Sequence, residues 1–205
     1  MNKRDLVKCA IAHKETPRNP YCIMLCEESK VQLREATGAS DIDALVDNDV
    51  EIVYSPWWDW YNLGEDWKGM DVPKSRSTVI CTGPSAKEFQ DNIKRVADET
   101  GRYILVAIWG SHWEKANFAR GIENFLGDIG GEPEFAKAFL TRIIDKNMVM
   151  LENFLAIKEI DGVLLGSDWG TQQGLIMSPS TWDEMIRPGE QREYDLVHSY
   201  GKDLS

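Results

Sequence analysis

Short apolar runs alternate along this chain with longer segments in which apolar residues recur every three or four positions. Runs of the first kind are typical of strands that are buried on both faces, and segments of the second kind are typical of amphipathic helices. The runs predicted as strands are residues 21–26, 50–54, 103–109 and 161–165, with 79–81 as a further short candidate.

Helix signals fill the intervals between these runs. Ser85 and Glu88 form a capping-box pattern at the start of a helix that Gly101 ends. Ser178 is an N-cap candidate that is followed by a proline at the first helical position. The predicted helices are residues 3–13, 29–37, 41–48, 85–100, 113–126, 133–158, 178–187 and 188–200.

The repeating order of strand and helix predicts an α/β fold, with a parallel sheet joined by crossover helices. An open doubly wound sheet and a partial barrel both fit this order. No strand is followed by a glycine-rich phosphate loop, so the sequence favours neither a Rossmann site nor a P-loop. The length of 205 residues fits a single domain over residues 1–205.

Charge and composition narrow the class of protein. The formal net charge is −11, and such an acidic chain repels phosphate backbones, so nucleic-acid binding is not expected. No apolar run reaches the roughly 18 residues of a membrane span, and the N-terminal segment lacks the pattern of a signal peptide. Cys22 and Cys26 are predicted to be buried free thiols and not metal ligands. A cytoplasmic protein is therefore expected.

Aromatic and polar residues gather directly after the predicted strands, where parallel sheets carry their functional sites. The chain has eight tryptophans, about three times average usage. Those at or just beyond strand ends are Trp57, Trp58, Trp60, Trp109, Trp113 and Trp169. An aromatic rim of this kind suits a large flat or hydrophobic ligand. The polar candidates are Glu27, Asp59, His112, Ser167, Asp168 and Gln172.

Each candidate also has a structural alternative. Asp168 could cap its loop, and a lone histidine such as His112 is more often a hydrogen-bonded loop residue than a ligand. Glu27 could be a solvated surface carboxylate. The tryptophans could fill gaps between loops. Asp59 and Asp168 would suit a glycosidase if their carboxyl groups lay about 5–10 Å apart.

The segment GSDWGTQQGLIMSPSTWDEMIRP, residues 166–188, resembles the uroporphyrinogen decarboxylase superfamily. It is more similar to the branch that includes corrinoid-dependent methyltransferases. Residues 195–202 are similar to the helix that precedes the family's fifth strand. The N-terminal positions that match the family's opening pattern are Arg4, Ala10, His13, Pro17 and Pro20.

This resemblance implies a TIM-type (β/α)₈ barrel, of which residues 1–205 would be the N-terminal part, with about four strands. Its carboxyl-end cleft would bind a tetrapyrrole, a corrinoid, or a methyl donor or acceptor. Ser167 or Asp168 would lie in that cleft, and Asp59 would stand where decarboxylases hold an essential aspartate. The family's arginine-rich motif after the first strand is replaced here by residues 24–29, which carry Glu27 and Glu28. Negative charge there disfavours a substrate rich in carboxylates.

The resemblance also implies that zinc is held by residues beyond Ser205, so no metal site is expected within this chain. Zinc and a corrinoid would belong to a complete barrel. The first hypothesis is methyl transfer, with Asp59, His112 and Asp168 as catalytic residues. The predicted substrate-binding residues are Glu27, Trp57, Trp58, Trp109, Ser167, Trp169 and Gln172.

Two alternatives to methyl transfer stay open. The first is uroporphyrinogen decarboxylation. The second is an inactive or partner-binding half-barrel. Expected partners are a small molecule or a corrinoid protein as substrate, and a second copy of the chain or a complementing C-terminal half.

Overall fold

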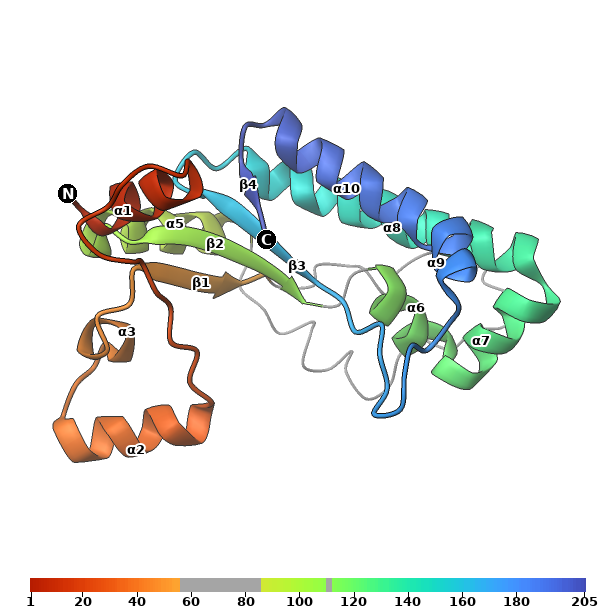
Figure 1. Ribbon diagram of the computed structural model, residues 1–205, viewed down its shortest axis with the longest axis horizontal. Coiled ribbons are helices and arrows are strands. Elements are labelled where there is room, and N and C mark those ends of the chain that lie inside the picture. The colour runs from red at the N-terminus through yellow and green to blue at the C-terminus, as the bar shows by residue number, and fades with distance from the viewer. Residues whose placement is uncertain (56–85, 110–111) are drawn as a thin grey trace.

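A four-stranded parallel sheet forms the centre of the protein (Figure 1). The computed structural model describes residues 1–55, 86–109 and 112–205. The strands are β1 (Val50–Tyr54), β2 (Tyr103–Trp109), β3 (Gly162–Gly166) and β4 (Asp203–Leu204). Each strand pairs with the next one along the chain, in the order β1-β2-β3-β4, and every pairing is parallel.

This sequential order places the connecting helices on one face of the sheet, because parallel crossovers are right-handed. A doubly wound sheet would reverse its strand order at a switch point, which the described strands do not do. The α/β class and the parallel sheet are therefore confirmed, and the arrangement is compatible with part of an α/β barrel. The helices are α1 (Lys3–Ile11), α2 (Glu27–Thr37), α3 (Ile42–Leu45), α5 (Ala86–Thr100), α6 (His112–Arg120), α7 (Ile122–Gly131), α8 (Pro133–Leu155), α9 (Pro179–Met185) and α10 (Arg187–Ser199).

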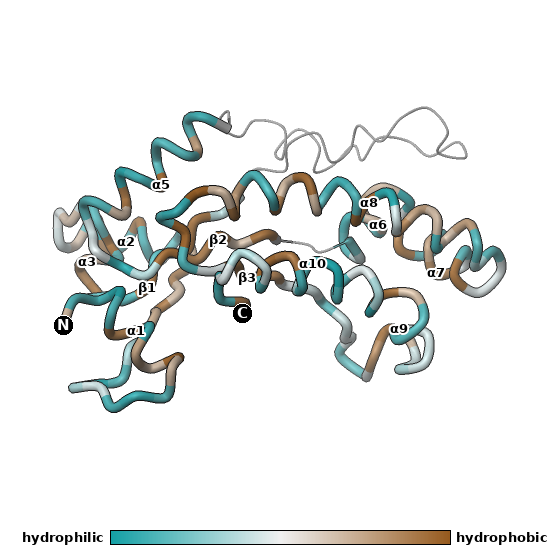
Figure 2. Tube along the Cα trace, turned by 90° about the horizontal axis from the view of Figure 1, so that it is seen from above, coloured by the Kyte–Doolittle hydropathy of each residue, from teal (hydrophilic) through white to brown (hydrophobic). Residues whose placement is uncertain are grey.

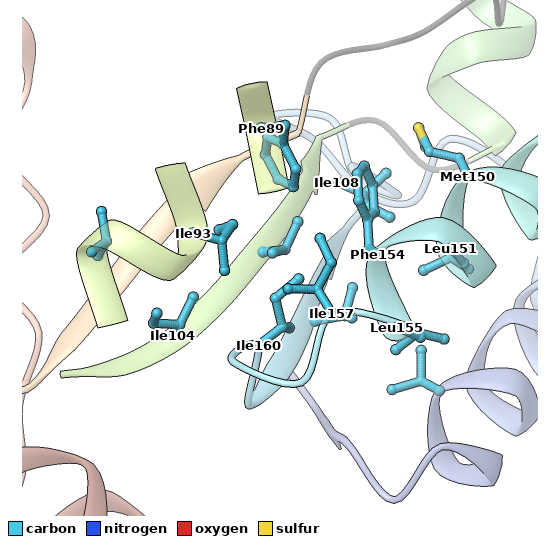
Figure 3. Close-up of a cluster of buried hydrophobic side chains, with 14 residues drawn as sticks. Phe89, Ile93, Ile104, Ile108, Met150, Leu151, Phe154, Leu155, Ile157 and Ile160 are labelled. Carbon is cyan, nitrogen blue, oxygen red and sulfur yellow. The ribbon is translucent and has the colours of Figure 1, made fainter. Parts of the chain in front are cut away.

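The main core lies between one face of β2 and the helices α5 and α8 (Figure 3). Ile104, Val106 and Ile108 alternate along β2, so their side chains point to the same face, and all three are buried. Phe89 of α5 and Phe154 of α8 meet over that face with ring centroids 5.0 Å apart. Burial of each such side chain stabilises the fold by about 1.5–3 kcal/mol. Figure 2 shows α1 and α5 on opposite sides of β1 and β2.

The opposite face of the sheet has a close crossing at its amino end. The Tyr103 side chain of β2 passes over Gly162 of β3, and its hydroxyl donates a hydrogen bond to Asp203 of β4 at 2.5 Å. A Cβ atom at position 162 would lie 2.7 Å from the Asp203 carbonyl oxygen and 3.1 Å from the Tyr103 hydroxyl. Glycine is therefore required at position 162, because only a residue without a side chain lets Tyr103 of β2 cross β3 and reach β4.

The prediction of a first strand over residues 21–26 is wrong. Residues 21–26 are not part of the sheet, and Met24 is 63% exposed. Buried polar side chains, and not a neighbouring strand, form hydrogen bonds with the backbone of this segment. Asn48 accepts a hydrogen bond from the Ile23 N–H at 2.7 Å, and Asp49 accepts one from the Tyr21 N–H at 3.0 Å. An apolar run alone cannot reveal that side chains, and not a neighbouring strand, will satisfy its backbone.

The other strands and helices follow the sequence pattern with three differences. The helix predicted over 113–126 is two helices, because the backbone at Gly121 has a φ of 85°. The helix predicted over 41–48 contains only α3, since Asp47 also adopts a positive φ, of 57°. β4 was not predicted as a strand. The Ser85 cap and the candidate strand at 79–81 lie outside the described residues.

Candidate functional site

The carboxyl ends of β2 and β3 are joined by Glu114. This residue lies in the first turn of α6, which begins directly after β2. Its carboxylate accepts a hydrogen bond from the Asp168 N–H at 2.6 Å and one from the Ser167 hydroxyl at 3.2 Å. The loop after β3 is thereby held against α6, and the Asp168 side chain is exposed. Glu114 was not predicted as a site residue, although an acidic residue soon after a strand end is the signal that identified the others.

Three indole rings extend from this junction. Trp113 and Trp169 lie with ring centroids 5.9 Å apart, and Trp169 and Trp182 meet edge to face at 6.1 Å and 82°. Trp113 is buried, whereas Trp169 and Trp182 are half-buried. Trp182 was not predicted, because it lies within a helix and not at a strand end.

Trp169 and Trp182 form one wall of an apolar cavity of about 240 Å³. The other lining residues are Leu175, Met177 and Pro179. The loop that leads to them is closed by Thr171, whose N–H and hydroxyl both donate to the Gly174 carbonyl oxygen. Gln172 is exposed at this loop, and its side chain makes no hydrogen bond within the described part of the chain. Of the predicted site residues, Ser167, Asp168, Trp169 and Gln172 all lie in the loop that follows β3.

His112 lies two residues before Glu114 in the sequence, but its side chain is directed elsewhere. Its side chain is fully buried, and its Nδ1 atom lies 3.9 Å from a carboxylate oxygen of Glu193 in α10. Burial, together with the positive charge of Lys115, lowers the pKa of His112 to about 3. A histidine in this position is neutral at physiological pH and is shielded from a ligand at the strand ends.

A buried polar network surrounds His112. The Lys115 ammonium donates to Asn147 Oδ1 at 2.8 Å, and Asn147 Nδ2 donates to Glu193 Oε1 at 2.8 Å. Burial lowers the pKa of Lys115 to about 8 and raises the pKa of Glu193 to about 7. The network joins α6, α8 and α10 within the helical layer.

Glu27 does not join the strand-end cluster. It lies in the first turn of α2, which packs against α3, and its carboxylate accepts a hydrogen bond from Lys30 at 2.9 Å. Trp57, Trp58 and Asp59 lie outside the described residues, as does the side chain of Trp109 at the end of β2. The separation of Asp59 and Asp168, on which a glycosidase would depend, is therefore a prediction without a structural test.

No group of three or more histidine, cysteine or acidic side chains that could hold a metal ion occurs among the described residues. Cys22 and Cys26 are both exposed, so the prediction that they are buried is wrong. The reason is that their segment is not a strand of the sheet. The Cys26 sulfur lies 3.2 Å from the Ser29 hydroxyl, and hydrogen bonding with Ser29 lowers the pKa of this thiol.

Comparisons of the chain with protein-family models, with curated proteins and with solved structures found no match. Within the described residues, no helix combines the length and the apolar character that crossing a membrane requires.

Proposed function

We propose that the carboxyl ends of β2 and β3 bind substrate in a protein of the uroporphyrinogen decarboxylase superfamily, and that the reaction is methyl transfer from or to a corrinoid. One observation carries the proposal. Glu114 holds the loop after β3, in which the exposed Asp168 directly precedes Trp169 of the apolar cavity. A polar anchor next to an aromatic pocket is the usual design of a small-molecule site.

The cavity and the carboxylate have different roles in this proposal. The cavity of about 240 Å³ is below the range of roughly 300–1,000 Å³ that drug-sized ligands occupy, so it suits a small methyl donor or acceptor. A corrinoid is far larger and would contact the exposed rim. The exposed Asp168 lies on that rim and anchors a polar group of the corrinoid, and the two indoles exclude water from the small ligand.

Zinc is not assigned to the described residues, because their donor atoms do not fit it. Cys22 is engaged with Val50 and Cys26 with Ser29, and the described part of the chain offers no third ligand beside them. The proposed function therefore assigns no metal ion to the described residues. Decarboxylation is less well supported, since residues 24–29 lack the arginine-rich motif with which the family binds substrate carboxylates.

Binding of methylcobalamin, measured by equilibrium dialysis, tests the proposal. We expect the chain to retain methylcobalamin, and Asp168→Asn to weaken retention about tenfold through loss of a charge-assisted contact. Asp98→Asn removes the same charge from the exposed side of α5 and is the matched control. No retention, or equal retention by Asp168→Asn and the wild type, would overturn the proposal. Turnover of uroporphyrinogen would replace it by decarboxylation.

A second candidate function is association with another copy of the chain. Among the described strands, β1 pairs only with β2 and β4 only with β3, so each has one unpaired edge. Ile23, Met24 and Tyr54 line one small cavity near β1 and are 46%, 63% and 55% exposed. Exposed apolar side chains beside a free edge favour an interface.

Sedimentation velocity distinguishes this candidate. A dimer that grows with concentration and that Met24→Glu disrupts would support it. Val149→Glu is the control, because Val149 is an equally exposed apolar residue, at 59%, on α8. A monomer at every concentration, or equal disruption by both substitutions, would exclude it.

A further inference from the structure

Another cavity lies at the amino ends of β3 and β4, at the end of the sheet opposite Ser167 and Asp168. Its volume is about 400 Å³, and it is bounded by α1, by the segment between α8 and β3, and by the segment between α10 and β4. The charged residues that line it are Arg4, Lys8, Lys158, Lys202, Asp161 and Asp203. Four of these six are basic, in a chain whose net charge is −11.

The two acidic residues of this cavity are already engaged. One Asp161 oxygen accepts from Arg4 Nε at 2.7 Å and pairs with Lys8 Nζ at 2.7 Å, and the other accepts from the Ile104 N–H at 3.0 Å. The Asp161 side chain is only 1% exposed. Asp203 accepts the Tyr103 hydrogen bond. The two carboxylates offset only part of the basic charge, because four basic and two acidic lining groups leave a formal charge of +2.

The basic groups, in contrast, keep unused donors. Arg4 uses its Nε–H on Asp161, and its two terminal amino groups donate to no partner within the described residues. The Lys8 side chain is 48% exposed, and Lys158, whose ammonium lies 3.6 Å from the Glu159 carboxylate, is 88% exposed, so both ammonium groups can reach a ligand. Asp161 holds Arg4 and Lys8 on the same oxygen atom, which brings the two cations together before any ligand binds.

Lys202 adds charge but no free donor. Its ammonium donates to the carbonyl oxygens of Ile157, Lys158 and Ile160. Burial is the largest cause of its lowered pKa, Asp161 opposes this effect, and Arg4 and Lys8 add to it by repulsion. An anion in the cavity would relieve this repulsion.

We infer that this cavity binds the phosphate group of a small phosphorylated molecule. Arg4 and Lys8 contact the phosphate oxygens, since a guanidinium fork and an ammonium group match a phosphate dianion. Lys158 lies at the rim. The side chains of Ile11 and Ile160 and the methyl group of Ala12 form an apolar wall that contacts the organic part of the ligand. The site is separate from the proposed methyl-transfer site and does not depend on it.

Calorimetric titration with inorganic pyrophosphate tests the inference, with potassium chloride of matched ionic strength as the reference. We expect saturable binding by the wild type, weakened about tenfold by Lys8→Gln and retained by Lys8→Arg. Lys94→Gln is the control, because it removes one exposed positive charge from α5, away from the cavity. We expect its affinity to equal that of the wild type.

Two results would overturn the inference. One is heat that does not exceed the chloride reference at millimolar pyrophosphate. The other is an equal affinity of the Lys8→Gln and Lys94→Gln variants for pyrophosphate. That result would mean that binding depends only on the overall charge of the protein. Circular dichroism of each variant shows that it is folded. If Arg4, Lys8 and Asp161 served only as a stabilising ion-pair cluster, Lys8→Gln would lower the melting temperature without changing pyrophosphate binding.

Discussion

Two aspartates flank the same strand and differ in their burial and in the partners of their carboxylates. Asp161 precedes β3, its side chain is 1% exposed, and it is engaged by Arg4, by Lys8 and by a backbone N–H. Asp168 follows β3, is exposed, and has its own N–H held by Glu114 while its carboxylate makes no hydrogen bond among the described residues. A carboxylate with all its partners stabilises the fold, whereas one that is held in place without partners is available to a ligand.

The two ends of the whole sheet differ chemically, as the two aspartates do. Its amino end contains ion pairs, the Tyr103–Asp203 hydrogen bond and a basic cavity. Its carboxyl end contains a carboxylate, a hydroxyl and two half-buried indoles around an apolar cavity. Because all four strands are parallel, every loop of one kind meets at the same end, and this is what separates the two chemistries.

The largest expected effect is that of Asp161→Ala. This substitution leaves the Ile104 N–H and two basic side chains without their partner, and we expect a loss of about 3 kcal/mol in the free energy of unfolding. Arg4 and Lys8 are partly exposed, so water replaces some of the lost interaction. Denaturant titration measures the change. A loss below 1 kcal/mol would show that the two aspartates do not differ in their structural role.

Glycine substitutions at the two ends of β3 give the next largest contrast. In Gly162→Ala the added methyl group lies 2.7 Å from the Asp203 carbonyl oxygen, and we expect a loss of about 1–3 kcal/mol from overpacking. Gly166→Ala is the matched control, because nothing lies within 4 Å of its Cβ position. Thermal melts of both variants check this, and equal melting temperatures would contradict the close crossing at the amino end.

Glu193 extends the comparison to a third carboxylate, which is buried in the helical layer. Burial raises its pKa from 4.5 to about 7, so the folded state favours its protonated form. Its stabilising contribution is complete below pH 4.5 and is lost as the pH rises through 7. Relative to the wild type, Glu193→Gln should therefore gain stability progressively between these pH values. Denaturant titrations at several pH values give this difference, and a constant offset would contradict it.

The smallest expected effect on stability is that of Asp168→Asn, at less than about 0.5 kcal/mol, because its carboxylate is exposed and has no described partner. The same substitution is expected to weaken methylcobalamin binding. Thermal melts and dialysis of one preparation separate the two quantities. A large drop in melting temperature would show that Asp168, like Asp161, is a structural residue.

Local sequence signals predicted the regular parts of the fold. The strand at 103–109 and the start of α9 were predicted at their observed positions, and Ser178 does accept the Thr181 N–H as its N-cap. These features depend on neighbours in the sequence, namely an apolar run, or a hydroxyl before a proline. The cluster of Ser167, Asp168 and Trp169 was predicted because strand ends can be located from such runs.

Other features depended on contacts between distant residues. Residues 21–26 have the composition of a strand but are held by Asn48 and Asp49, and β4 is too short to give a periodic signal. Glu114 and Trp182 joined the site only when α6 and α9 packed beside the end of β3.

The amino-acid sequence by itself determined the α/β class, most helix ends and three of the four strands, since each follows from hydrophobic period and capping over a few residues. Only the tertiary structure decided which carboxylates are buried and which are exposed. Asp161 and Asp168 are the same residue type beside the same strand. Their difference arises because α1 covers one end of β3 with basic groups, while α6 fixes the loop at the other end and leaves its carboxylate in water.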